Sequence, residues 1–183
     1  MKLTNHTERL KFIHNYQVKD GDTLRKIIDG GAVSFVNVRH PFERLISAYL
    51  HFRTGRKKKE ENKTFEQFIV EDILEKLPKK QNKGTYRDIN PHWRPYNSFC
   101  AFCNINYDIV SKTETFEEDK QRAMDILGLE NEQKGKRLNI HGGSDIKNKT
   151  RHFFKDVSEE HIAAIVNFYK YDFLMFDYNS NLQ

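Results

Sequence analysis

The chain has 183 residues, a length that suits one domain, with 37% hydrophobic and 13% aromatic residues. Its net charge is +5 and its pI is near 9.1, which favours an anionic partner such as a nucleotide, a sulfated or uronic glycan, a nucleic acid or an anionic membrane. No stretch is long and apolar enough to span a bilayer, and the N-terminus has no signal-peptide core. We therefore expect no membrane-spanning segment in this sequence.

The first elements lead to a strand and a helix. Residues 1–31 are polar with scattered apolar positions and predict a short helix or irregular segment, then a second short helix that ends at Gly30. Residues 32–38 are apolar and rich in valine, which predicts a buried strand. A helix is predicted from Pro41, because proline suits the first helical position and the apolar residues that follow share one helical face. That face consists of Phe42, Leu45, Ile46, Tyr49 and Leu50.

Two residues near this junction are candidates for binding an anion. A helix N-terminus offers backbone N–H groups and the positive end of a dipole, and the planar guanidinium of Arg39 matches a phosphate. Ser47 lies two turns into the helix, off its apolar face, where its hydroxyl can donate to the same anion. The alternative is an arginine that closes a strand and a serine on a solvated helix face.

The motif Arg-x-Pro-x-x-Arg-x-x-Ser-x-Tyr occupies residues 39–49. It resembles the 3′-phosphate-binding motif of sulfotransferases, which use 3′-phosphoadenosine 5′-phosphosulfate (PAPS) as donor, and it is most similar to the chondroitin and dermatan 4-O branch of the carbohydrate sulfotransferases. The resemblance implies that Arg39 and Ser47 hold the 3′-phosphate. It also implies a three-layer α/β fold, P-loop-NTPase-like, in which helices flank a mostly parallel sheet and the nucleotide lies at the strand C-termini.

Sulfotransferases carry a second nucleotide motif upstream of this one. It is a strand–loop–helix in which backbone N–H groups, a lysine and a Ser/Thr bind the 5′-phosphosulfate, as a P-loop binds phosphate. The glycines at residues 21 and 30–31 are not accompanied by that lysine and Ser/Thr. We therefore expect either an N-terminally incomplete chain or a homologue that lacks the donor-activating loop.

The middle of the chain predicts a connector and a helix. Residues 52–63 form a charged run, interpreted as a solvated loop or as a surface that steers an anionic glycan. Residues 64–77 predict an amphipathic helix that begins with a capping box between Thr64 and Gln67. Its apolar face consists of Phe65, Phe68, Ile69, Ile73 and Leu77. Residues 79–91 predict a polar loop.

A second block also resembles the family. His-Trp-Arg-Pro and Cys-x-x-Cys at residues 92–103 precede Tyr-Asp-Ile-Val-Ser-Lys-Thr-Glu-Thr at residues 107–115, in the family's order. Two cysteines without further ligands at the usual spacing do not predict a metal site, so Cys100 and Cys103 are expected to be buried thiols or a disulfide. Residues 107–112 predict a strand. The next helix is predicted to be capped by Thr115 with Glu118 and to end at Gly128.

The same block supplies the candidate for a general base. We choose His92, because a histidine titrates near neutral pH and this one lies within the family-like block. Glu114, which closes the predicted strand near the expected site, is the rival. The alternative for His92 is a half-buried loop histidine that only forms hydrogen bonds.

Residues 130–152 predict a loop rich in Gly, Lys and Asn. In related sulfotransferases a loop near here closes over the nucleotide, so Lys149, Thr150 and Arg151 are secondary candidates for phosphate contact, with a plain surface loop as the alternative. A helix is predicted from Ser158, with an apolar face of Ile162, Ile165, Val166 and Tyr169. The resemblance covers about residues 32–178 of one sulfotransferase-like domain, residues 1–183.

The expected function is therefore PAPS-dependent transfer of a sulfuryl group to a glycan hydroxyl, on a chondroitin-, dermatan- or N-glycan-like acceptor. The alternative is a non-catalytic or truncated homologue that binds only nucleotide or glycan. The resemblance implies a glycoprotein on the luminal side of the Golgi membrane, attached through an N-terminal anchor that this sequence does not show. Sequons at Asn5, Asn62 and Asn148 fit that location. We expect no nucleic-acid partner, because the lysines are dispersed and no nucleic-acid-binding motif is present.

Overall fold

The computed structural model describes residues 33–55, 63–77, 89–98, 106–128 and 146–182, together with residues 22, 26, 30, 100 and 102. The elements predicted in residues 1–31, the question of a 5′-phosphosulfate loop, and most of the charged connector at residues 52–63 lie outside the described residues. None of the helices in the described part of the chain is both long and apolar enough to cross a membrane.

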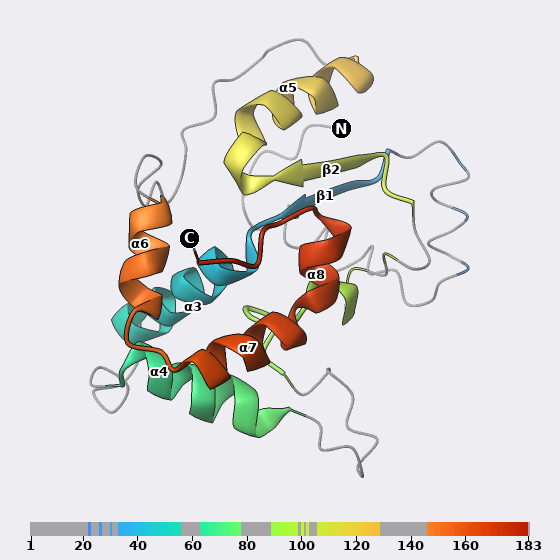
Figure 1. Cartoon of the computed structure of the whole chain (residues 1–183). Helices are drawn as coiled ribbons and strands as arrows, with labels where there is room; N and C mark the ends of the chain where they lie inside the picture. The colour runs from blue at the N-terminus through green and yellow to red at the C-terminus, as the bar shows by residue number, and fades with distance from the viewer. Residues whose placement is uncertain are drawn as a thin grey trace.

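A parallel pair of strands forms the described sheet. Strand β1 (Phe35–Val38) pairs with β2 (Ile109–Lys112), so that Phe35 lies opposite Ile109 and Val38 opposite Lys112. Both predicted strands are confirmed, although each is shorter than predicted. Before the ladder, Asp108 Oδ2 accepts hydrogen bonds from Ser34 N at 2.7 Å and from Ser34 Oγ at 2.6 Å. Because the strands are parallel, the residues that follow them share one edge of the sheet (Figure 1).

Helix α3 (Pro41–Gly55) begins directly after β1 at the predicted proline. Its predicted apolar face is confirmed, since four of its members are buried and Leu50 packs against the core from a partly exposed position. The buried four are Phe42, Leu45, Ile46 and Tyr49. The helix therefore carries the 39–49 motif on one side while its other side fills the core.

The helix predicted at residues 64–77 is confirmed at its start, but its hydrogen-bonding pattern departs from that of an α-helix after Gln67. Thr64 N donates to Gln67 Oε1 at 2.8 Å and Gln67 N donates to Thr64 Oγ1 at 3.1 Å, which is the predicted capping box. Helix α4 (Phe65–Gln67) continues as a π-helix (Phe68–Ile73) and a 3-10 turn (Leu74–Lys76). The wider π turn lets residues five apart, Phe68 and Ile73, both face the core.

Helix α5 (Phe116–Ile126) follows β2 and packs along it (Figure 1). Thr115 is the N-cap residue of α5, as predicted, but its side chain makes no capping bond to the helix, so the predicted capping box with Glu118 is wrong. A 3-10 turn (Thr113–Thr115) precedes the helix, and Thr115 Oγ1 donates to Asp119 Oδ2 at 2.6 Å. The predicted end is confirmed, because Gly128 has a φ of +61°, the left-handed conformation that follows many helices.

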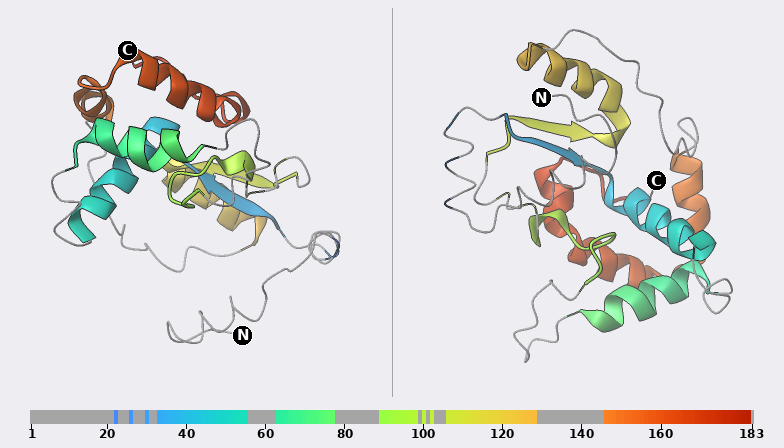
Figure 2. Two further views of the ribbon diagram at one scale, coloured as in Figure 1. Left: turned by 90° about the horizontal axis from the view of Figure 1, so that it is seen from below. Right: turned by 180° about the vertical axis from the view of Figure 1, so that it is seen from behind.

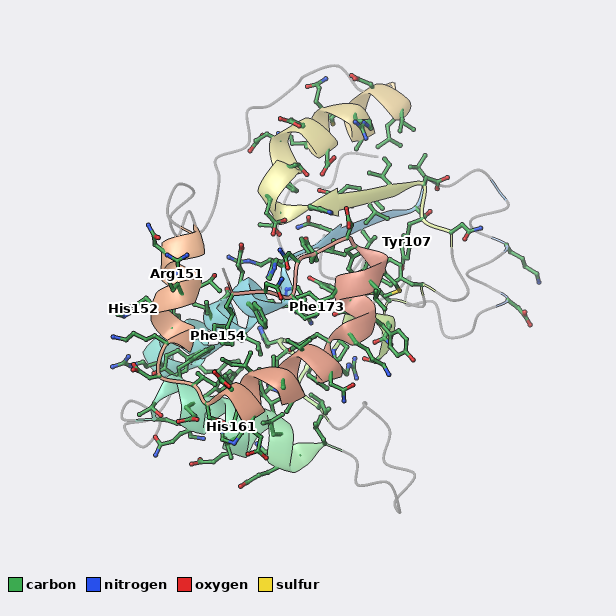
Figure 3. All side chains as sticks on the ribbon, viewed as in Figure 1. Tyr107, Arg151, His152, Phe154, His161 and Phe173 are labelled. Carbon is green, nitrogen blue, oxygen red and sulfur yellow. The ribbon has the colours of Figure 1, made fainter. Side chains whose placement is uncertain are left out.

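The loop predicted over residues 130–152 is wrong from residue 146 onwards, because these residues form helix α6 (Ile146–Phe154). The helix is held by aromatic side chains at its C-terminal end: the ring centroid of Phe154 lies 4.7 Å from that of Phe42, and that of Phe153 lies 5.9 Å from that of Tyr49. Within residues 148–154 the exposed residues are polar or charged, namely Asn148, Arg151 and His152, and such a composition is also typical of a loop. Figure 3 labels Arg151 and His152 on the exposed part of α6 and Phe154 at its end.

The C-terminal helices complete the core. Ser158 caps α7 (Glu159–Phe168) as predicted, since its side chain accepts a hydrogen bond from His161 N at 3.3 Å. Helix α8 (Lys170–Met175) follows directly, with Tyr169 fully buried at the junction. Figure 2 shows from two further sides that α3, α4 and α7 gather at one end of the molecule, while the sheet and α5 lie at the other.

Candidate functional site

Arg39 lies between the end of β1 and the first turn of α3. Its side chain is 30% exposed, and its Nε lies 3.5 Å from Oε2 of Glu43. The Glu43 side chain is only 11% exposed. The guanidinium is therefore reachable from solvent while a carboxylate of its own chain orients it.

Ser47 lies one turn beyond Glu43 and is half-buried. Residues 39, 43 and 47 fall at four-residue intervals, which on a helix places side chains on one side. The step from Glu43 to Ser47 advances about 6 Å along the helix axis. Ser47 therefore lies one helical turn beyond Glu43, and Glu43 in turn contacts Arg39, which precedes the helix.

Two backbone N–H groups near the start of α3 have side-chain partners. His40 N donates to Glu114 Oε1 at 3.2 Å, and Phe42 N donates to His40 Nδ1 at 3.2 Å. Glu114 also accepts a hydrogen bond from the Tyr178 hydroxyl at 3.2 Å. The rival candidate for the base therefore serves as a cap that joins the turn after β2 to the helix and to the C-terminal segment.

His40 packs into an aromatic cluster beside this cap. Its ring centroid lies 5.0 Å from that of Tyr178 and 5.7 Å from that of Phe173, and its Nε2 lies 3.0 Å from the carbonyl oxygen of Asn179. Burial lowers the pKa of His40. A neutral ring can accept from Phe42 N and donate to Asn179, so His40 ties the chain end to the start of α3.

Lys112 and Glu43 lie beside the β1–α3 junction, although neither is predicted as a site residue. The parallel register places Lys112 beside Val38 at the strand end, and its Nζ lies 4.8 Å from the ring centroid of Tyr178. Burial and the nearby Glu114 carboxylate raise the pKa of Glu43, against the opposing effect of Arg39. The four-residue spacing between Arg39 and Glu43 could have indicated their contact from the sequence. The position of Lys112 could not be predicted in this way, because it depends on pairing between distant strands.

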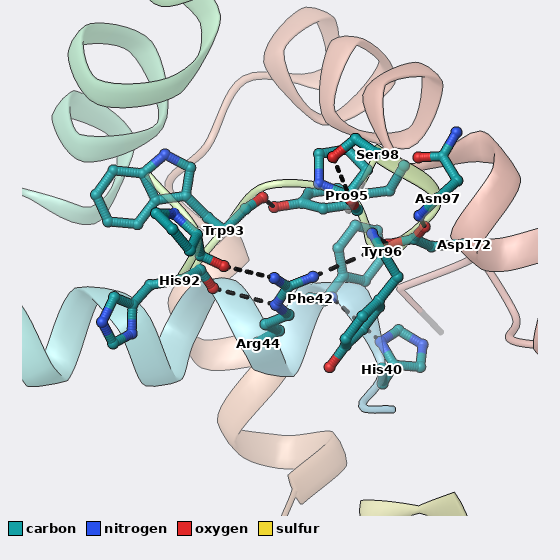
Figure 4. A network of polar contacts seen from close by, with 12 residues as sticks. His40, Phe42, Arg44, His92, Trp93, Pro95, Tyr96, Asn97, Ser98 and Asp172 are labelled. Atoms are coloured by element: carbon teal, nitrogen blue, oxygen red, sulfur yellow. Dashed lines mark hydrogen bonds and ion pairs between the residues drawn. The ribbon is translucent and has the colours of Figure 1, made fainter. Parts of the chain in front are cut away.

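Arg44, the second arginine of the motif, turns away from this side and holds another segment (Figure 4). It is 8% exposed. Its Nε donates to the carbonyl oxygen of His92 at 3.1 Å and its Nη2 to that of Pro91 at 2.8 Å. Its guanidinium also lies 4.1 Å from the ring centroid of Tyr96. Arg44 therefore fixes residues 91–96 against α3.

Asp172 of α8 holds the same segment from the opposite side. Its carboxylate accepts hydrogen bonds from Tyr96 N at 2.9 Å and from Asn97 N at 3.4 Å, and lies 4.0 Å from Arg44 Nη1. The hydroxyl of Tyr169 donates to the carbonyl oxygen of Trp93. Burial raises the pKa of Asp172. These contacts hold residues 93–97 against the C-terminal helices.

His92 lies at the far end of α3 from Arg39. Its exposed side chain stacks on His51 with the ring centroids 5.4 Å apart, and its ring meets the edge of Phe52 at 5.3 Å. His51 lies one turn beyond Ser47. The structure therefore places His92 near the Ser47 end of the site, and α3 spans the distance to Arg39.

The remaining candidates lie elsewhere. Lys149, Thr150 and Arg151 are on α6, which contacts the apolar face of α3 through Phe153 and Phe154 rather than the Arg39 side. Burial raises the pKa of the Cys100 thiol to about 11, and Cys103 lies outside the described residues. Within the described ranges, no group of three or more His, Cys, Asp or Glu residues could hold a metal ion.

Comparison with known proteins identifies the family. The model of the sulfotransferase family matches residues 2–179. The chain is 31% identical to carbohydrate sulfotransferase 11 of Mus musculus over 93% of this chain and 52% of that protein. It is 34% identical to carbohydrate sulfotransferase 9 of Homo sapiens over 49% of this chain and 21% of that protein, and 26% identical to carbohydrate sulfotransferase 10 of Xenopus laevis over 79% and 46%.

The chain spans about half the length of the curated relatives that it matches over most of its own length. No solved structure matches it. The family match nevertheless runs through nearly every described element, including the strand–helix junction with Arg39 and Ser47 and the segment with His92. The protein belongs to the sulfotransferase family.

Proposed function

We propose that this protein transfers a sulfuryl group from PAPS to a hydroxyl group of a glycan. The observation that carries the proposal is the β1–α3 junction, where Arg39 follows a parallel strand and contacts Glu43 in the first turn of the helix that also carries Ser47. Three carbohydrate sulfotransferases among the relatives support the glycan acceptor. We also propose that the described strand pair belongs to a larger, mostly parallel sheet, which forms the middle layer of a three-layer α/β fold.

In this proposal the 3′-phosphate of the donor lies between Arg39 and Ser47. The planar guanidinium donates two parallel hydrogen bonds to phosphate oxygens, and the serine hydroxyl donates a third. Lys112, at the end of the neighbouring strand, adds positive charge at the same edge of the sheet. The ion pair with Glu43 orients Arg39 before the nucleotide arrives.

The transfer step requires an acceptor hydroxyl in line with the sulfur atom and the bridging oxygen that leaves. The hydroxyl oxygen forms a new bond to sulfur while the bond from sulfur to the 5′-phosphate oxygen breaks, which releases adenosine 3′,5′-bisphosphate. His92 takes the hydroxyl proton through its exposed imidazole. Arg44 supports this role, because it fixes the main chain of His92 on the helix that carries the donor site.

The proposed acceptors are chondroitin-, dermatan- or N-glycan-like chains, and the proposed location is the luminal side of the Golgi membrane. The basic charge of the chain supports an acidic glycosaminoglycan, since long-range attraction raises the rate at which a polyanion associates. Asn148, in one of the sequons, is exposed on α6 and could carry a glycan there.

A transfer assay tests the proposal. Radiolabelled PAPS is incubated with a panel of desulfated glycans and the parent protein, its Arg39→Ala variant, or Arg53→Ala as a control on the exposed end of α3. We expect label on a glycan with the parent and Arg53→Ala, and at least a hundredfold less with Arg39→Ala. If the parent binds the nucleotide but labels no glycan, the protein is a non-catalytic homologue and the proposed activity is wrong.

A further inference from the structure

The phosphate-facing arginine of the proposed site is already paired with a carboxylate of its own chain. We propose that Glu43 is a positioning residue that holds Arg39 in the free protein and takes up a proton when the 3′-phosphate of the donor binds. This inference rests on the proposed function. It adds a proton-linked control of donor affinity to the site.

In the proposed site, the 3′-phosphate lies close to the Glu43 carboxylate. Ser47 lies one turn beyond Glu43 on α3, and the Arg39 guanidinium meets the Glu43 carboxylate at 3.5 Å. A phosphate bound by the Arg39 guanidinium would therefore approach that carboxylate, which is already in contact with the guanidinium. The Glu43 side chain is 11% exposed, so solvent screens this repulsion only weakly.

The groups that face Glu43 come from three elements. Arg39 comes from the link between β1 and α3, Glu114 comes from the turn after β2, and Tyr178 comes from the C-terminal segment. His40 lies between them with a lowered pKa, and Lys112 reaches the ring of Tyr178. A phosphate dianion thus enters a site with two carboxylates, two cations and a neutral imidazole.

Protonation of Glu43 is the least costly way to relieve this repulsion. Burial and Glu114 already raise the pKa of Glu43. Glu114 already accepts hydrogen bonds from His40 N and from the Tyr178 hydroxyl, whereas Glu43 contacts the guanidinium that the phosphate would take over. Once protonated, Glu43 can donate a hydrogen bond to the phosphate, and Arg39 is released to bind it.

The linkage gives donor affinity a defined pH dependence. Where one proton is taken up with the ligand, the Kd rises about tenfold per pH unit above the pKa of Glu43 in the free protein. The second ionisation of the phosphate, near pH 6, acts in the opposite direction at lower pH. The parent is therefore expected to bind the 3′-phosphate best at an intermediate pH, with affinity falling on the alkaline side.

Calorimetry with adenosine 3′,5′-bisphosphate measures this linkage directly. The parent, Glu43→Gln and Glu43→Asp are titrated between about pH 5.5 and pH 8.5 in pairs of buffers with different ionisation heats, which gives the number of protons taken up. Glu114→Gln is the matched control for loss of a carboxylate in the same cluster. Thermal melting shows that each variant is folded.

We expect proton uptake by the parent on the alkaline side, no such uptake by Glu43→Gln, and about tenfold tighter binding by Glu43→Gln than by the parent at about pH 8. Glu43→Asp restores the uptake, and Glu114→Gln keeps it. With adenosine 5′-monophosphate, which lacks the 3′-phosphate, parent and Glu43→Gln behave alike.

Equal proton uptake by the parent and Glu43→Gln overturns the inference and leaves nucleotide binding in place. A difference that persists with the 5′-monophosphate also overturns it, because Glu43 would then respond to another part of the ligand. A folded parent that binds no bisphosphate at any pH overturns both the inference and the proposed function.

Discussion

Arg44 Nε donates a hydrogen bond to the main-chain oxygen of His92 at 3.1 Å. The contact joins two segments that lie 48 residues apart in sequence. Since α3 also carries Ser47 and begins next to Arg39, one rigid helix sets the distance from the proposed donor site to the proposed base. The second arginine of the motif thus has a structural task that differs from that of the first.

Arg44→Met should destabilise the protein by about 3 kcal/mol, because it removes the cation beside the buried Asp172 carboxylate and leaves two main-chain oxygens without their donor. Urea unfolding followed by circular dichroism measures the change. Lys155→Met, at an exposed position whose ion pair is a 3.9 Å contact with Asp156, is the control and should change stability by less than about 0.5 kcal/mol. A similar stability for Arg44→Met and the parent would show that Arg44 does not hold the 91–96 segment.

His92→Gln should lower the rate of sulfuryl transfer about a hundredfold or more, because it removes the group that accepts the hydroxyl proton. The affinity for adenosine 3′,5′-bisphosphate should stay within about twofold of the parent value, since the His92 ring lies against His51 and Phe52 rather than Arg39. Single-turnover kinetics and calorimetry separate the two quantities. Full activity in His92→Gln would exclude His92 as the base.

Asp119→Asn should make stability less dependent on pH in the acid range. Hydrogen bonds from the Thr115 hydroxyl and from Lys112 N lower the pKa of Asp119 in the folded protein. Its contribution is therefore complete above the pKa of an unfolded aspartate, about 3.9, and is lost as the pH falls through the lower folded value. Denaturant unfolding from about pH 6 down to about pH 3 measures the slope, which should be steeper for the parent than for the variant.

The exposed residue Asp156 provides the comparison for that experiment. Asp156→Asn should follow the parent curve across the same range, because the turn after β2 is unchanged. If Asp119→Asn lost stability on acidification as steeply as the parent does, the carboxylate would not be the cap of this turn.

Thr64→Ala should cost about 1 kcal/mol of stability, because it removes the side-chain oxygen that accepts from Gln67 N. Gln67→Ala removes the reciprocal bond to Thr64 N. The two bonds form one capping box, so the double variant should lose less than the sum of the single losses. Chemical denaturation of the three variants and the parent gives the coupling energy. Strict additivity would mean that the two bonds act independently.

The features that the sequence predicts correctly are local. Helix α3, the capping box at Thr64 and the cap at Ser158 each depend on residues within one or two turns, and propensity and spacing report these directly. The spacing that places Ser47 one turn beyond Glu43 is local in the same sense. The sequence predicts β1 and β2 as two separate strands, but it does not predict that they pair with each other.

The features that the sequence does not reveal depend on distant partners or on competition between neighbours. The Asp119 carboxylate, rather than Glu118, bonds the 3-10 turn before α5, because it accepts from the Thr115 hydroxyl and from Lys112 N. Helix α6 was missed, because its polar side resembles a loop and its stability comes from Phe154 against Phe42, more than a hundred residues away. The partners of Glu114 and the place of Lys112 follow from strand pairing and the chain end, which no short window contains.

The most direct test of the account is calorimetric binding of adenosine 3′,5′-bisphosphate to the parent protein and to Arg39→Ala, with adenosine 5′-monophosphate as the second ligand. We predict micromolar binding of the bisphosphate by the parent, at least tenfold weaker binding by Arg39→Ala, and little difference between the two proteins with the monophosphate. Bisphosphate binding that is equally strong in a folded Arg39→Ala variant would contradict a 3′-phosphate site at the β1–α3 junction.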